Sequence, residues 1–109
     1  MATDKEMKLV EQLLDKTRKR NIAWEPTAQS DEFVSTLGVR VSFIVATSTV
    51  SWRDVETLTM RDELDRILLR VDSDSVPQVS ELYSEARRVA LKVDESLDSV
   101  LDQLGRMDA

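Results

Sequence analysis

The stretch SVPQVSELYSEARRVALKVDESLDSVLDQLG, residues 75–105, decides the fold class and the shape of the chain. Its apolar side chains recur at steps of three and four, the spacing of one face of a helix. Ser75 is placed to cap this helix, Pro77 suits its first turn, and Gly105 suits its end. The pattern predicts one helix over residues 76–104, about 42 Å long if it is continuous. Its apolar positions are Val79, Leu82, Ala86, Val89, Val93, Leu97, Val100 and Leu104.

This helix is too long for the rest of the chain to cover. Strands are typically roughly 17–20 Å long, so a small sheet covers only the first half of such a helix. The average apolar step is close to 3.5 residues, which is typical of a short coiled-coil seam. We therefore expect the same helix of a second copy to cover the rest, in a homodimer. The expected interface consists of Leu82, Ala86, Val89, Val93, Leu97, Val100 and Leu104.

The spacing leaves the direction of this pairing open between parallel and antiparallel. Three acidic residues, Asp94, Asp98 and Asp102, lie off the seam. In a symmetric pair they would repel one another unless an arginine faces them. This sensitivity to geometry favours an antiparallel pair.

The N-terminal part of the chain predicts a second helix, over residues 4–20. Thr3 and Glu6 have the spacing of a capping box, with Thr3 as the N-cap. Apolar residues then follow at helical spacing, and basic residues gather at the end, as the helix dipole favours. Asn21 suits the end of this helix because asparagine tolerates the left-handed conformation.

In the middle of the chain the apolar side chains alternate with a period of two residues, which is typical of strands. Residues 33–37 and 39–45 are rich in β-branched and aromatic side chains, and Gly38 suits a tight turn between two antiparallel strands. Residues 47–52 fit a further strand or hairpin arm. Ile22 and Trp24 alternate in a short extended segment, and we expect Trp24 to be buried between the first helix and the sheet.

The apolar residues within 54–72 fit both a helical stripe and an alternating strand, so the pattern does not decide the secondary structure of this segment. We favour a loop or helical turn over residues 54–63 and a strand over residues 65–72. The whole pattern predicts an α+β fold in one domain, residues 1–109: an N-terminal helix, a small antiparallel β-meander and a long C-terminal amphipathic helix.

Composition excludes several kinds of chemistry. The chain has 109 residues, 41% of them hydrophobic, a formal net charge of −6, and neither histidine nor cysteine. Without these two residue types there is no imidazole base, no thiolate nucleophile and no ordinary zinc site. We expect no enzymatic activity and no cofactor. The start lacks the apolar core of a signal peptide and no apolar run is long enough for a membrane span, so we expect an acidic cytoplasmic protein.

Three small clusters are candidate sites. Lys16, Arg18, Lys19 and Arg20 could contact an anion such as phosphate, although compensation of the helix dipole explains them more simply. The run Asp72 to Ser75 alternates acids, as some cation sites do, but it lacks the glycine and the glutamate of a calcium loop and precedes a helix. Ser48, Thr49 and Ser51 have no neighbouring base that could activate a hydroxyl.

Two segments carry a resemblance. ELYSEARRVALKVDESLDSVLDQL, from Glu81 to Leu104, and RNIAW, from Arg20 to Trp24, resemble a class of small bacterial and phage proteins. In that class a helix leads to a Trp-containing segment, a β-meander and a long terminal helix. No activity of that class can be transferred to a residue of this chain. The order of elements is also similar to that of type III secretion chaperones, without the extra helix and strands that those proteins carry before the last helix, unless residues 54–63 supply the helix.

These observations lead to two expectations about function. The first is a non-enzymatic protein-binding or accessory protein of bacterial or phage origin that acts as a homodimer on an unidentified protein partner. The alternative is a nucleic-acid-associated regulator that uses the basic end of the first helix, although the acidic net charge makes nucleic acid a poor partner.

Overall fold

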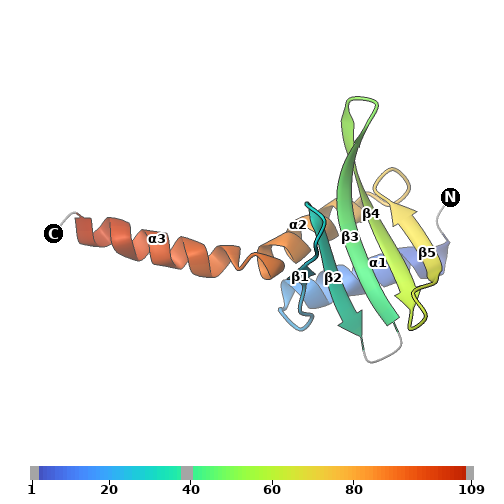
Figure 1. Ribbon diagram of the computed structural model, residues 1–109, viewed down its shortest axis with the longest axis horizontal. Coiled ribbons are helices and arrows are strands. Elements are labelled where there is room, and N and C mark those ends of the chain that lie inside the picture. The colour runs from blue at the N-terminus through green and yellow to red at the C-terminus, as the bar shows by residue number, and fades with distance from the viewer. Residues whose placement is uncertain (1–2, 38–40, 108–109) are drawn as a thin grey trace.

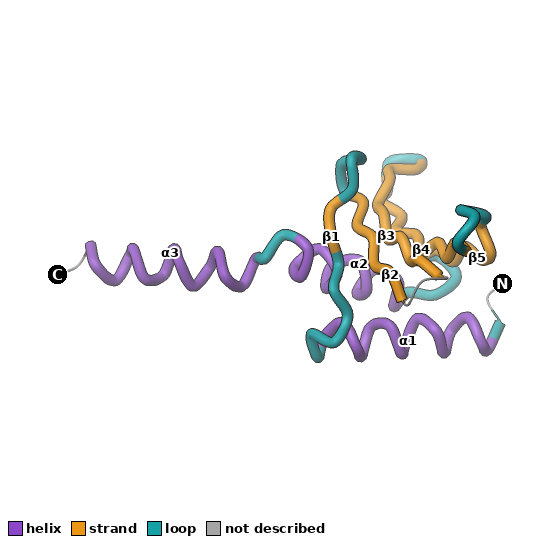
Figure 2. Tube along the Cα trace, turned by 60° about the horizontal axis from the view of Figure 1, so that its bottom comes forward, coloured by secondary structure: helices purple, strands orange, loops and turns teal. Residues whose placement is uncertain are grey.

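The structure is a computed structural model that describes residues 3–37 and 41–107. It shows a two-layer α+β fold in which α1 and α2 lie on one face of an antiparallel sheet, while α3 projects away from both layers (Figures 1 and 2). The predicted fold class is confirmed. The elements are α1 (Asp4–Arg18), β1 (Glu25–Pro26), β2 (Glu32–Leu37), β3 (Val41–Val50), β4 (Arg53–Asp62), β5 (Ile67–Asp72), α2 (Gln78–Ala90) and α3 (Val93–Met107).

The sheet is a simple meander with the strand order β1-β2-β3-β4-β5. Neighbouring strands are antiparallel, and the register places one buried row across the four longer strands. Because side chains alternate between the faces of a strand, this row points toward the helices. The row consists of Phe33, Val45, Leu58 and Val71, all at most 3% exposed.

The core lies between this row and α2, which packs on the sheet and in turn supports α1. Val79 and Leu82 of α2 and Val10 of α1 are fully buried. Trp24 closes the end of this core at 3% exposure, as the sequence predicted, and its indole Nε1–H donates a 3.0 Å hydrogen bond to the Thr17 hydroxyl. The segment between α1 and β1 therefore shares one apolar centre with the sheet and both inner helices.

The N-terminal helix follows its prediction closely. The capping box is present, with the Thr3 hydroxyl accepting from the Glu6 amide at 3.2 Å. The helix ends at Arg18, two residues earlier than predicted, and Arg20 rather than Asn21 takes the left-handed conformation, with φ of 62°. Arg20 holds this turn because its guanidinium donates to the Thr17 carbonyl at 3.0 Å.

The prediction for residues 54–63 was wrong, because this segment is strand β4 and not a loop or helical turn. β4 pairs with β3 over its full length of ten residues and with β5 on its other side. Apolar and β-branched side chains occupy both of its faces, so no period of two shows in the sequence. The strand predicted over 65–72 is confirmed as β5, and residues 47–50 form the end of β3, the predicted hairpin arm. The predicted strand over 33–37 is confirmed as β2, whereas the predicted Gly38 turn lies outside the described residues.

The long C-terminal helix predicted over 76–104 is confirmed in outline, although a short break divides it into α2 and α3. α2 ends because Lys92 has φ of 54° and its amide donates to the Val89 carbonyl, three residues back, at 3.3 Å. Ser75 does not cap α2, since Pro77 occupies the N-cap position without a side-chain bond. Gly105 does not end the helix either, because α3 continues to Met107.

Candidate interaction surface on the C-terminal helix

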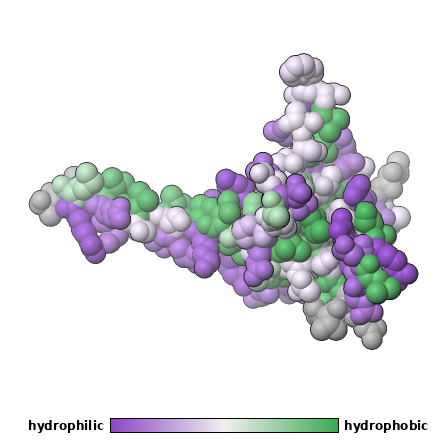
Figure 3. Space-filling model, viewed as in Figure 1, coloured by the Kyte–Doolittle hydropathy of each residue, from purple (hydrophilic) through white to green (hydrophobic). Residues whose placement is uncertain are grey.

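An exposed apolar surface lies along α3. Of the described residues 93–107 none is buried, and Figure 3 shows a hydrophobic strip along the helix with a hydrophilic side beside it. We call the exposed side chains of this surface the α3 strip. It consists of Leu97 (48% exposed), Val100 (50%), Leu101 (63%), Leu104 (52%) and Met107 (77%). Exposed apolar surface of this kind commonly marks an interface.

The break after Ala90 divides the predicted interface into two parts with different roles. Leu82 and Ala86 are fully buried by the chain's own sheet and helix α1, so they belong to the core and not to an interface between copies. Val89 and Val93 are partly buried. Leu97, Val100 and Leu104 are exposed, and for these positions the predicted interface remains a prediction. Leu101 and Met107 extend the strip beyond the residues chosen from the sequence.

An ionic cluster holds the first turn of α3 against the body of the protein. Asp94 accepts a 3.1 Å hydrogen bond from Arg20 at the end of α1 and a second bond from Arg88 of α2. Arg20 also pairs with Glu85 at 3.5 Å. The bonds from Arg20 and Arg88 lower the pKa of the Asp94 carboxyl, and Asp94 in turn raises the pKa of Arg20. We call these four residues the Asp94 cluster; its ion pairs join the turn after α1 to α2 and to the first turn of α3.

The basic group at the end of α1 is largely paired with carboxylates. Arg18 contacts Glu81 at 3.1 Å, Lys19 contacts Asp15 at 3.1 Å, and Arg20 belongs to the Asp94 cluster. These pairs neutralise the local charge that a phosphate contact by Lys16, Arg18, Lys19 and Arg20 would need. The anion contact therefore stays a prediction, and carboxylates already pair with three of its four basic residues.

The acidic run before α2 serves the local turn. The Asp72 carboxylate accepts from the Ser75 amide at 2.9 Å, and Asp74 pairs with Arg53 at 2.8 Å. Within residues 3–37 and 41–107, no group of three or more acidic side chains is arranged to hold a metal ion.

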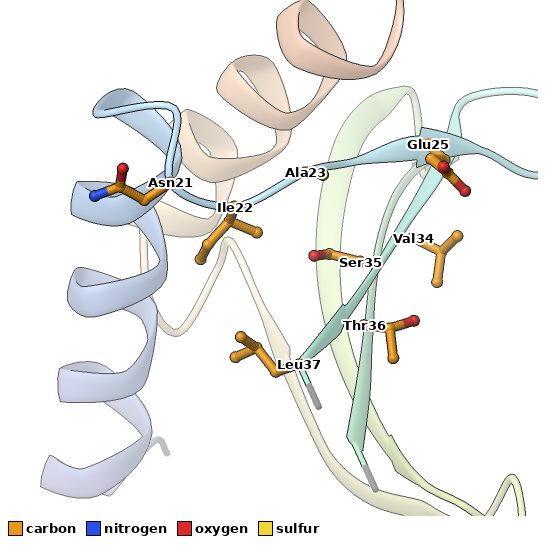
Figure 4. Close-up of a pocket in the computed structure, with 8 residues that line it drawn as sticks. All are labelled: Asn21, Ile22, Ala23, Glu25, Val34, Ser35, Thr36 and Leu37. Atoms are coloured by element: carbon orange, nitrogen blue, oxygen red, sulfur yellow. The ribbon is translucent and has the colours of Figure 1, made fainter. Parts of the chain in front are cut away.

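Two further features were not predicted from the sequence. Trp52 is fully exposed in the turn between β3 and β4, where Ser51 and Trp52 have φ of 51° and 70°. Such a turn favours glycine and asparagine, so the sequence carried no turn signal there. The second feature is a cavity of about 280 Å³ between the segment after α1 and strand β2 (Figure 4), lined by Asn21, Ile22, Ala23, Glu25, Val34, Ser35, Thr36 and Leu37.

Comparison with known proteins finds no matching family model, no matching curated protein and no matching solved structure. The resemblances to small bacterial and phage proteins and to secretion chaperones therefore remain expectations. In the part of the chain that the structure describes, no helix is both long and apolar enough to cross a membrane.

Proposed function

We propose that the chain is a non-enzymatic protein-binding accessory protein that acts as a cytoplasmic homodimer joined through the α3 strip. One observation carries the proposal: five large apolar side chains share an exposed side of a helix that projects from the folded body. The resemblance to small bacterial and phage proteins supports the expected origin. The lack of histidine and cysteine supports a binding role rather than catalysis.

The α3 strip has enough apolar surface to drive association. Full burial of one large apolar side chain contributes about 1.5–3 kcal/mol. The strip residues are between 48% and 77% exposed, so the five together contribute about 4–9 kcal/mol per copy. Two copies contribute twice that amount, against an association cost of about 4–15 kcal/mol. The balance favours a dimer of moderate affinity.

A second copy is the occupant that the pattern of α3 favours. Leu97, Val100, Leu104 and Met107 recur at steps of three and four, which is the repeat of a coiled-coil seam that pairs with itself. In an antiparallel pair the C-terminal Arg106 of one helix approaches the acidic first turn of the other. The two helix dipoles then point in opposite directions, which is the favourable arrangement. In a parallel pair the acidic turns instead lie side by side.

Light scattering on two double variants tests the dimer. Leu97→Asp with Leu104→Asp places two charges in the strip and should yield a monomer with unchanged circular dichroism, because neither side chain is part of the core. Ser99→Asp with Gln103→Asp adds the same charge outside the strip and should leave a dimer. A wild-type chain that is monomeric at about 100 μM, or a strip variant that stays dimeric, would overturn the proposal.

A further inference from the structure

The cavity beside β2 exists because the chain leaves the sheet after a very short edge strand. β1 pairs with β2 only at Glu25↔Val34 and Pro26↔Phe33. Before Glu25, the chain turns out of the sheet toward α1, so residues 21–25 and the second half of β2 form the two sides of a wedge (Figure 4). The result is an open cavity of about 280 Å³ at an uncovered sheet edge.

The backbone of Thr36 faces this open edge. The Asp31 carbonyl accepts from Thr47 next to β3, whereas the Glu32 carbonyl accepts from Thr27 on the β1 side. Because backbone groups alternate in direction along a strand, those of Thr36 point to the same side as those of Glu32. The described part of β1 ends its pairing at Val34, so the Thr36 N–H and C=O have no strand partner on that side.

The side chains around the wedge suit an apolar group with one polar contact. Ser35, Ile22 and Leu37 point to the helix side of the wedge, whereas Val34 and Thr36 point to the other side (Figure 4). Ile22 is 8% exposed and forms the buried floor, while Leu37 is a 48% exposed wall. Ser35 is 4% exposed and is one of the residues that line the cavity. Its hydroxyl is a polar group in a lining that is otherwise largely apolar on the helix side.

We propose that this wedge binds an extended peptide segment, which adds a strand beside β2. The peptide backbone pairs with the free N–H and C=O of Thr36, and an apolar side chain fills the space between Ile22 and Leu37. Strand addition of this kind takes its affinity from main-chain hydrogen bonds and its specificity from side-chain pockets. Of the eight described lining residues only Glu25 is charged, and the chain carries a net charge of −6, so the peptide carries a basic residue next to the apolar one. This site is separate from the α3 strip and does not depend on the dimer.

Amide chemical shifts in NMR, recorded with a defined probe peptide, test the proposal. The probe is a capped peptide of alternating leucine and threonine with one terminal lysine. It should produce saturable shifts at Thr36, Leu37 and Ala23. A probe with N-methylated leucine amides should lose binding because it cannot pair with the edge, and a probe with glutamate in place of lysine should bind more weakly.

Three variants separate strand addition from unspecific contact. Leu37→Lys should weaken binding at least about tenfold. Leu68→Lys is the matched control, since Leu68 is 52% exposed near the opposite edge of the sheet, and it should bind like the wild type. Thr36→Pro removes the outward N–H, a change that edge strands tolerate, and should also abolish binding while the circular dichroism stays the same. Equal binding by Leu37→Lys and Leu68→Lys, shifts confined to β5 or α3, or no saturable shift at Thr36 would overturn the proposal.

Discussion

Replacement of Trp24 by alanine should destabilise the protein more than any surface change. The indole is 3% exposed and closes the end of the core beside α1. Aromatic-to-alanine changes in cores cost about 3–5 kcal/mol. A chain of this length has a free energy of unfolding of about 5–15 kcal/mol, so Trp24→Ala should remove a large fraction of the stability.

Urea denaturation followed by circular dichroism measures this loss. With a slope of about 1.5 kcal/mol per M, the midpoint of Trp24→Ala should fall by roughly 2–3 M. Trp52→Ala is the matched control because Trp52 is fully exposed, and its midpoint should shift by less than about 0.5 M. If the two alanine variants showed the same midpoint, the argument that Trp24 seals the core would be refuted.

A double-mutant cycle separates packing from the hydrogen bond. Trp24→Phe keeps an aromatic ring but leaves the fully buried Thr17 hydroxyl without its 3.0 Å donor, which should cost about 1–3 kcal/mol. Thr17→Val with Trp24→Phe removes both polar partners together. The double variant should therefore lose less stability than the sum of the two single variants, and strict additivity would show that the bond contributes nothing.

Acid should loosen the attachment of α3, because the arginines of the Asp94 cluster hold the pKa of Asp94 below its ordinary value of 3.8. A carboxyl whose pKa is lowered in the folded state stabilises that state at pH values above its ordinary pKa, and the stabilisation is lost as the pH falls through the lowered pKa. Amide exchange in the first turn of α3 should therefore rise in this acidic range. Asp94→Asn should remove this pH-dependent rise. Ser51→Asn with Trp52→Gly suits the left-handed turn between β3 and β4 and should raise the urea midpoint by the equivalent of about 1 kcal/mol; a lower midpoint would contradict the turn argument. Leu58→Ala should cost about 2–5 kcal/mol in the same urea assay, since Leu58 is fully buried in the central row of the sheet; a loss below about 1 kcal/mol would contradict that packing.

The predicted C-terminal interface positions differ in burial, and this difference separates substitutions that affect folding from those that affect association. Leu82 contributes to the core, whereas Leu97 and Leu104 lie on a helix that no other described element covers. Substitutions in α3 therefore test association without unfolding the domain, and substitutions in α2 test folding itself. The Asp94 cluster lies at the boundary between these two regions.

The features that the sequence determined by itself are those that depend on local chemistry. The capping box of Thr3 and Glu6 acts over three residues, and the alternation in β2 acts over one strand, so both are visible in a short window. The burial of Trp24 also follows from its alternation with Ile22 beside a helix end. The exposed second half of the C-terminal apolar seam was predictable because its length exceeds what a small sheet covers.

The features that only the tertiary structure decided depend on residues far apart in the chain. β4 is a strand because β3 and β5 pair with it on both sides, although its own sequence carries no clear period. The helix break at Lys92 lies next to the contact between Arg20 and Asp94, which are 74 positions apart, and no window of the C-terminal sequence contains that partner. The wedge at Thr36 likewise arises where the chain before Glu25 departs from the sheet. For β4 the deciding hydrogen bonds come from strands elsewhere in the chain, and spacing within the segment does not contain them.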